Sequence, residues 1–224
     1  MKTVVFLILV PLKKNGIELK DFKLEDFADE TAGESMAPGG GSIAAYVGTL
    51  GVSLGTMVAN LSAHKAGWDN KWELFSDWAV KGQAYKEQLL FLVDEDTNAF
   101  NKIIDGFRLP KDTNEEKQAR ALAIENATIY ATEIPFKVME TAFQSMEVMQ
   151  AMLKDGLQNS LSDAGVGVLC ARTAVIGAYF NVRINAKDIK DRAFAASILA
   201  KAAIIYEQTI AIENDTIAFI DSKI

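Results

Sequence analysis

The feature that most constrains this chain is a long stretch without charge. From Met36 to Ala63 no side chain is charged, and a second stretch, from Asp163 to Arg183, has a single internal charge, Arg172. Both contain several glycines, and those of the first stretch are spaced three and four residues apart, so that another backbone can approach one helix face closely. The two stretches are therefore predicted to be helices buried among other helices.

The rest of the chain also favours helices. Strand signals are scarce, and segments rich in Ala, Leu, Glu, Lys and Met recur between short breaks. The predicted helices cover about 24–31, 42–63, 69–107, 113–155, 163–183 and 188–220, with Pro135 as a kink or break in the fourth. We expect an all-α multihelical bundle with two long buried glycine-containing helices. It forms a single domain over residues 1–224, in which residues 1–22 are an N-terminal extension without an assigned role.

Charge and composition exclude several classes of function. The net charge of −7 and the lack of a Lys or Arg run argue against nucleic acid as a partner. Cys170 is the only cysteine and His64 the only histidine, which excludes an intramolecular disulfide and a zinc site with several soft ligands. We therefore expect no metal, and this cysteine usage fits a reducing cytoplasm.

The apolar segments also raise the question of export and of membrane insertion. The run from Val4 to Val10 imitates a short secretion signal but no cleavage site follows, so it is interpreted as a buried strand or docking segment. Polar residues dilute the stretch from Met36 to Ala63, which argues against a membrane span. Helices that are apolar nearly all round need partners on every side, and we expect a homodimer to supply some of them.

A glycine-rich turn precedes the first buried helix. Its residues are Pro38, Gly39, Gly40, Gly41 and Ser42. Free backbone N–H groups and the positive end of the helix dipole would face whatever occupies this turn. It is not a phosphate-binding loop of the Walker type, since no Gly-Lys-Ser/Thr follows. The alternative is a structural turn capped by Ser42.

Side chains at helical spacing form two stripes along the predicted helix that contains Asp96. One consists of Asp96, Phe100, Ile103 and Phe107, and the other of Asp94, Asn98 and Asn101. A carboxylate in line with three apolar side chains loses solvent, which raises its pKa and suits it to carry protons near neutral pH. The second stripe either binds a heterocycle through hydrogen bonds or faces water.

Two further motifs flank the second buried stretch. Asp163 either caps that helix or orients a polar substrate at the mouth of a cleft. At the other end Asn181 and Asn185 share a helix face, and Arg183 either clamps a carboxylate or satisfies the last helix carbonyls.

Taken together and in this order, these motifs resemble the cyclodeaminase domain of formiminotransferase-cyclodeaminase and the related bacterial methenyltetrahydrofolate cyclohydrolases. The resemblance runs from about Phe27 to the C-terminus. It rests on 35–42, 57–61, 96–100, 109–111, 162–165 and 181–185. It implies an all-helical fold, a dimer and a cleft for reduced folate. Family members often carry an acidic residue where this chain has Asn98, so that position is given no role in proton transfer.

The chemistry that the resemblance implies is cyclodeamination of 5-formiminotetrahydrofolate, with Asp96 and Asp163 sharing the roles of proton acceptor and donor. Substrate contacts are expected from Pro38, Gly39, Gly40, Gly41, Ser42, Asp94, Asn98, Asn101, Arg183 and Asn185. Arg183, Lys65 or another cation would hold the glutamyl tail, or a polyglutamyl tail. No cofactor is expected beyond the tetrahydrofolate substrate, which a separate formiminotransferase would deliver. The alternatives are a methenyltetrahydrofolate cyclohydrolase and a non-catalytic folate-binding module.

Overall fold

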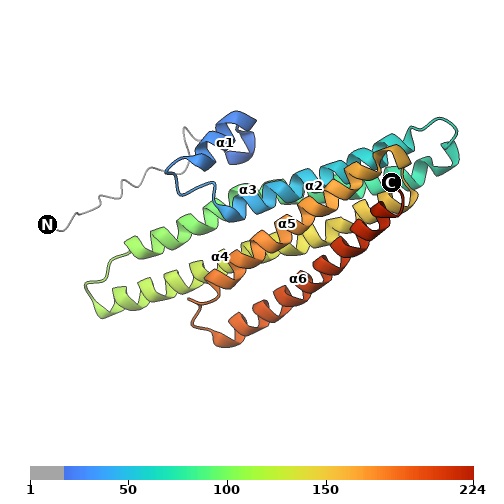
Figure 1. Ribbon diagram of the computed structural model, residues 1–224. Helices are drawn as coiled ribbons and strands as arrows, with labels where there is room; N and C mark the ends of the chain where they lie inside the picture. The colour runs from blue at the N-terminus through green and yellow to red at the C-terminus, as the bar shows by residue number, and fades with distance from the viewer. Residues whose placement is uncertain (1–17) are drawn as a thin grey trace.

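The computed structural model describes residues 18–224 as a bundle of long helices (Figure 1). The α-helices are α1 Leu24–Ala32, α2 Gly40–Ala63, α3 Trp72–Arg108, α4 Asn114–Asp155, α5 Leu161–Asn185 and α6 Arg192–Asp221. Short 3-10 turns are η2 Leu19–Asp21, η3 Asp69–Lys71 and η4 Gln158–Ser160. The described residues contain no strand, and the predicted all-α bundle is confirmed. The apolar run from Val4 to Val10 lies outside these residues.

Local signals set the helix starts. Thr113 and Glu116 form a capping box at the start of α4, since each side chain bonds the other's backbone N–H. The last helix begins at Arg192, a few residues later than predicted, because Asp191 is its cap. The carboxylate of Glu125 in α4 accepts the backbone N–H groups of Lys190 and Asp191, at 2.7 and 3.2 Å, and so ties the residues just before α6 to α4.

The helices α2, α3, α4 and α5 enclose the core, and α6 runs along the outside of α5 (Figure 1). Helices α2 and α5 pack antiparallel and unusually close, because glycines meet where they cross. A Cβ on Gly51 would lie 2.8 Å from the carbonyl oxygen of Gly167, and one on Gly167 equally close to that of Gly51. This crossing brings the start of α2 to the end of α5, which decides where a site can form.

By length and composition alone, three stretches of the described residues could cross a membrane: Gly40–Ala63, Gln158–Asn185 and Arg192–Asp221. Their most apolar windows are 61%, 44% and 22% buried inside the molecule, in that order. Packing within the chain thus accounts for most of the apolar character of α2. The other two stretches keep more apolar surface exposed.

Candidate active site

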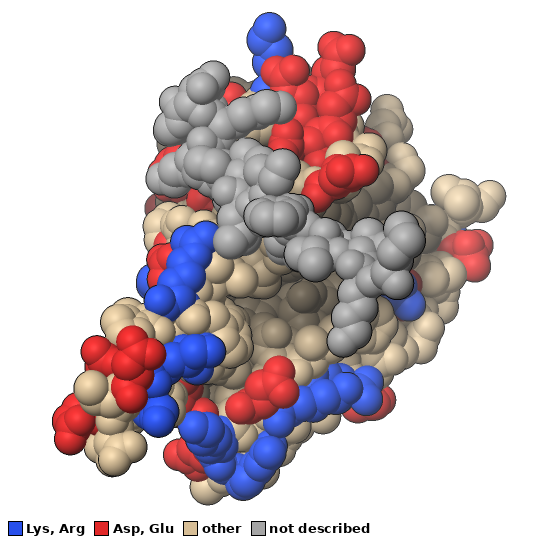
Figure 2. Space-filling model, turned by 90° about the vertical axis from the view of Figure 1, so that its left-hand side faces the viewer, with Lys and Arg blue, Asp and Glu red and all other residues tan. Residues whose placement is uncertain are grey.

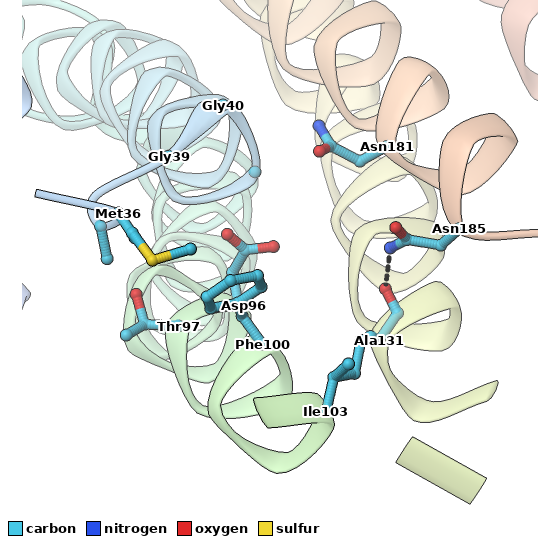
Figure 3. Close-up of a pocket in the computed structure, with 12 residues that line it drawn as sticks. Met36, Gly39, Gly40, Asp96, Thr97, Phe100, Ile103, Ala131, Asn181 and Asn185 are labelled. Carbon is cyan, nitrogen blue, oxygen red and sulfur yellow. Dashed lines mark hydrogen bonds between the residues drawn. The ribbon is translucent and has the colours of Figure 1, made fainter. Parts of the chain in front are cut away.

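A pocket of about 150 Å³ opens where the start of α2, the C-terminal half of α3, the middle of α4 and the end of α5 meet (Figure 3). The lining residues are Met36, Ala37, Gly39, Gly40, Gly41, Asp96, Thr97, Phe100, Ile103, Ala131, Asn181 and Asn185. The walls therefore come from four segments that lie far apart in the sequence.

Asp96 is the carboxylate of this pocket. Its Oδ2 accepts a hydrogen bond from the Ser42 hydroxyl at 3.1 Å, in the first turn of α2. The cap residue of α2, Gly39, has no side chain that could accept a hydrogen bond. Asp96, from the neighbouring helix α3, acts as the cap instead. Burial raises the pKa of Asp96 above its ordinary value, and the hydroxyl and backbone N–H of Ser42 oppose that rise.

Gly41 makes this contact possible. A Cβ at this position would lie 2.5 Å from Cγ of Asp96 and 2.6 Å from its Oδ2, closer than atoms of a real side chain approach. At Gly40, by contrast, the nearest atom to an added Cβ is Nδ2 of Asn181 at 3.8 Å. The glycine-rich turn therefore provides room for a carboxylate of the chain itself.

Two asparagines face Asp96 from the end of α5 (Figure 3). Nδ2 of Asn181 donates to the carbonyl of Gly177 at 3.0 Å, and Nδ2 of Asn185 donates to the carbonyl of Ala131 in α4 at 2.6 Å. Phe100 and Ile103 of α3 supply an apolar part of the pocket lining. The pocket thus combines one desolvated carboxylate, two carboxamides and an apolar surface that can contact a flat ring.

Comparison with known proteins identifies the fold and the family. The family model described as "Formiminotransferase-cyclodeaminase" matches residues 23–204. The formimidoyltransferase-cyclodeaminase of Mus musculus is 37% identical over 186 residues, which are 83% of this chain and 34% of that protein. The methenyltetrahydrofolate cyclohydrolase of Methylorubrum extorquens is 31% identical over 201 residues, which are 90% of this chain and 97% of that protein.

The chain belongs to the formiminotransferase-cyclodeaminase family.

A solved structure agrees with this assignment at the level of fold. Formiminotetrahydrofolate cyclodeaminase from Thermotoga maritima superimposes with a TM-score of 0.76 over 92% of this chain and 97% of that chain, at 21% identity. The chain spans about a third of the length of the formimidoyltransferase-cyclodeaminase relatives, and nearly the whole length of the bacterial cyclohydrolase.

Within this family member, the structure does not bring Asp163 to Asp96. Asp163 lies in the first turn of α5, whereas Asn181 and Asn185 line the pocket from its end. At 1.5 Å per residue, Asp163 is about 27 Å along the helix from Asn181. The structure therefore does not bring together the two aspartates expected to share proton transfer, because α5 runs antiparallel to α2 and its opposite end meets the glycine-rich turn.

The stripe of Asp94, Asn98 and Asn101 also lies off the pocket. Asp94 Oδ1 accepts the backbone N–H of Leu19 at 2.6 Å, and its Oδ2 is 3.8 Å from Nζ of Lys20. Asn98 and Asn101 continue this face of α3 and do not line the pocket. None of the three lines the pocket wall, and Asp94 instead holds the segment that precedes α1.

Of the other residues expected to contact substrate, some lie in or beside the pocket and others do not. Gly39, Gly40, Gly41 and Asn185 line the pocket, Ser42 binds Asp96, and Pro38 is buried behind the turn. Arg183 is exposed, with its guanidinium 5.4 Å from the ring centre of Tyr179, and it does not line the pocket because it lies off the face shared by Asn181 and Asn185. Lys65 follows the far end of α2 and stacks on Trp68.

Several lining residues have no predicted site role, above all Asn181 and Ala131. For Asn181 a signal was present, since it shares a helix face with Asn185. For Ala131 the signal is indirect: Pro135, four residues later, has no N–H to bond the carbonyl of Ala131. Asp96, Phe100 and Ile103 line the pocket as their stripe predicts, whereas Phe107 at its end is 54% exposed.

Proposed function

We propose that this chain is a cyclodeaminase that converts 5-formiminotetrahydrofolate to 5,10-methenyltetrahydrofolate and ammonia. Support comes from the family, from the names of its relatives and from one observation above all. The pocket places a carboxylate of raised pKa, Asp96, beside a glycine turn and opposite two carboxamides. These are the elements needed to bind a heterocycle and move a proton next to it.

In the proposed reaction N10 attacks the amidine carbon of the protonated formimino group, and a tetrahedral adduct forms. Asp96 takes the proton that N10 loses and returns it to the amino group of the adduct, so that the C–N bond breaks and ammonia leaves. The methenyl cation remains and the carboxylate is regenerated. Since Asp163 is remote, one carboxylate acts first as base and then as acid, which a raised pKa favours.

The walls suit the substrate's shape. Phe100 and Ile103 offer apolar contact to the faces of the pterin, while Gly39 and Gly40 let its edge approach the backbone. Figure 2 shows a hollow at one end of the molecule, with Lys and Arg side chains along its left and lower edges. We propose that such cations attract the carboxylates of a glutamyl or polyglutamyl tail, so that KM rises with salt.

A cyclohydrolase is the second candidate, because the Methylorubrum extorquens relative of that name matches this chain over 97% of its own length. In that reaction Asp96 would activate water in place of N10. Incubating the purified protein with 5-formiminotetrahydrofolate and, separately, with 5,10-methenyltetrahydrofolate distinguishes the two. We expect ammonia and methenyl absorbance from the first substrate. Turnover of the methenyl compound alone selects the cyclohydrolase, and binding without turnover selects a non-catalytic module.

We also propose that the chain is a homodimer. Large apolar side chains are exposed on α2 and α5 beside their glycine-mediated contact. They are Leu50, Met57, Leu61, Val166, Leu169, Phe180 and Ile184. Their helical spacing forms one apolar stripe on each helix, and together the stripes fit a second copy of the same face.

Sedimentation tests this interface. The wild-type protein is expected to sediment as a dimer, and Leu169→Glu as a monomer because a charge would be buried at the interface. Lys117→Glu, an exposed residue in the first turn of α4, which carries neither stripe, is the control and should remain dimeric. A monomeric wild type, or one that floats with phosphatidylcholine vesicles, contradicts the dimer proposal.

A further inference from the structure

Helix α4 continues through a proline, and this leaves one backbone carbonyl without its usual partner. In an α-helix the carbonyl of residue 131 would accept the N–H of residue 135, but residue 135 is proline and has none. Ala131 and Pro135 are both buried, and buried backbone carbonyls are nearly always paired. A carbonyl in this position needs a donor from elsewhere in the fold.

Asn185 is that donor. Its Nδ2 lies 2.6 Å from the carbonyl oxygen of Ala131, across the gap between α5 and α4 (Figure 3). Because only the N–H₂ end of a carboxamide can donate to a carbonyl, this bond fixes which way the amide points. Its Oδ1 is left on the other side, toward the pocket that Asn185 lines.

Asn181 is fixed in the same way one turn earlier, since its Nδ2 donates to the carbonyl of Gly177 at 3.0 Å. In Figure 3 both carboxamide groups point from α5 toward the side on which Asp96 lies. Two carboxamide oxygens on neighbouring turns of one helix form an acceptor edge. A ring with adjacent N–H donors, such as the pyrimidine part of a reduced pterin, complements such an edge.

We propose that Pro135 is a positioning residue: by leaving the Ala131 carbonyl to Asn185, it holds the Asn185 oxygen ready to accept an N–H of the substrate. The inference rests on the proposed function for the identity of the substrate. The hydrogen bond itself can be tested without substrate. It also accounts for a proline inside a long helix, where the lost bond would otherwise only destabilise.

The test compares Pro135→Ala, Asn185→Ala and the double variant. Pro135→Ala restores an N–H, so the carbonyl can turn back along the helix axis and release Asn185. We expect KM for 5-formiminotetrahydrofolate to rise about two- to tenfold, the usual effect of one lost hydrogen bond, while kcat stays within about twofold. The double variant should have the KM of Asn185→Ala, because both changes act through the same oxygen. Glu133→Ala, an exposed neighbour on α4, is the control.

A separate measurement follows the hydrogen bond in the protein without ligand. With selectively ¹⁵N-labelled asparagine, the Asn185 side-chain signal is assigned by its loss in Asn185→Ala. Its amide protons should exchange with water faster in Pro135→Ala than in wild type or Glu133→Ala. Unchanged exchange, an unchanged KM in Pro135→Ala, or KM effects that multiply in the double variant would overturn the proposal. If wild-type protein turns over neither folate, the proposed function fails, while the exchange measurement still decides whether Pro135 orients Asn185.

Discussion

The carboxylate of Asp96 occupies the space into which a side chain at Gly41 would project, since an added Cβ would lie 2.5 Å from its Cγ. At the start of α2, Ser42 thus donates its hydrogen bond to a carboxylate of α3, so the chain itself supplies the partner for this helix end. A substrate meets the edge of this arrangement, where the turn, Asp96 and the asparagines of α5 surround one pocket.

Gly41→Ala is expected to displace Asp96. Overpacking of this kind costs about 1–3 kcal/mol in the free energy of unfolding, and a misplaced proton carrier lowers kcat about 10- to 100-fold. Urea unfolding and turnover measure the two effects. Gly40→Ala, whose Cβ meets nothing closer than 3.8 Å, is the stability control. It should unfold at the same urea concentration as wild type or at a higher one. A Gly41→Ala protein as stable and active as wild type would show that the contact is not required.

The raised pKa of Asp96 predicts a particular pH dependence of stability. An unfolded aspartate titrates near pH ~3.9, whereas the folded carboxyl keeps its proton to higher pH because it is buried. Between the two pKa values the native state binds more protons than the unfolded state, so the free energy of unfolding falls as pH rises. This contribution is fully present below the unfolded pKa and is lost as pH rises through the folded one.

Urea unfolding of wild type and Asp96→Asn between pH ~3.5 and ~7 checks this prediction. Asn cannot titrate, so the variant should gain stability relative to wild type as pH rises through this range. Parallel stability curves for the two proteins would mean that burial does not raise the pKa of Asp96.

Asp94→Ala tests whether the second stripe serves the fold. It removes the acceptor of the Leu19 N–H and the partner of Lys20, and we expect a loss of about 1–3 kcal/mol in stability with KM unchanged. Asp105→Ala, an exposed carboxylate on the same helix, is the comparison and should cost under about 0.5 kcal/mol. A large rise in KM for Asp94→Ala at unchanged stability would show that Asp94 contacts the substrate instead of supporting the fold.

Much of the fold can be predicted from the sequence because its signals are local. The charge-free stretches, the capping box at Thr113 and the proline after Leu109 each act within one helix or turn. The stripe of Asp96, Phe100 and Ile103 is local too, since its members need only the helical repeat to face one way. That is why one wall of the pocket is predictable from a single segment.

The rest of the site depends on how the helices run past one another. Asp163 and Asn185 sit at opposite ends of α5, and only the antiparallel packing of α5 on α2 decides which end reaches the glycine-rich turn. Similarly, Asp94 has the spacing of a binding residue, but the segment around Leu19 folds onto it. Both arrangements are determined by tertiary contacts, which no short motif encodes.

Whether Asp96 carries the proton is decided by measuring kcat for 5-formiminotetrahydrofolate in Asp96→Asn and in Asp163→Asn. Both variants exchange an aspartate for an isosteric amide, but only Asp96 lies in the pocket. We expect a loss of about 10²- to 10⁴-fold for Asp96→Asn, the usual contribution of a general acid–base group, with kcat near wild type for Asp163→Asn. Near-normal turnover in Asp96→Asn, with its fold intact, would contradict the assignment of Asp96 as the proton carrier.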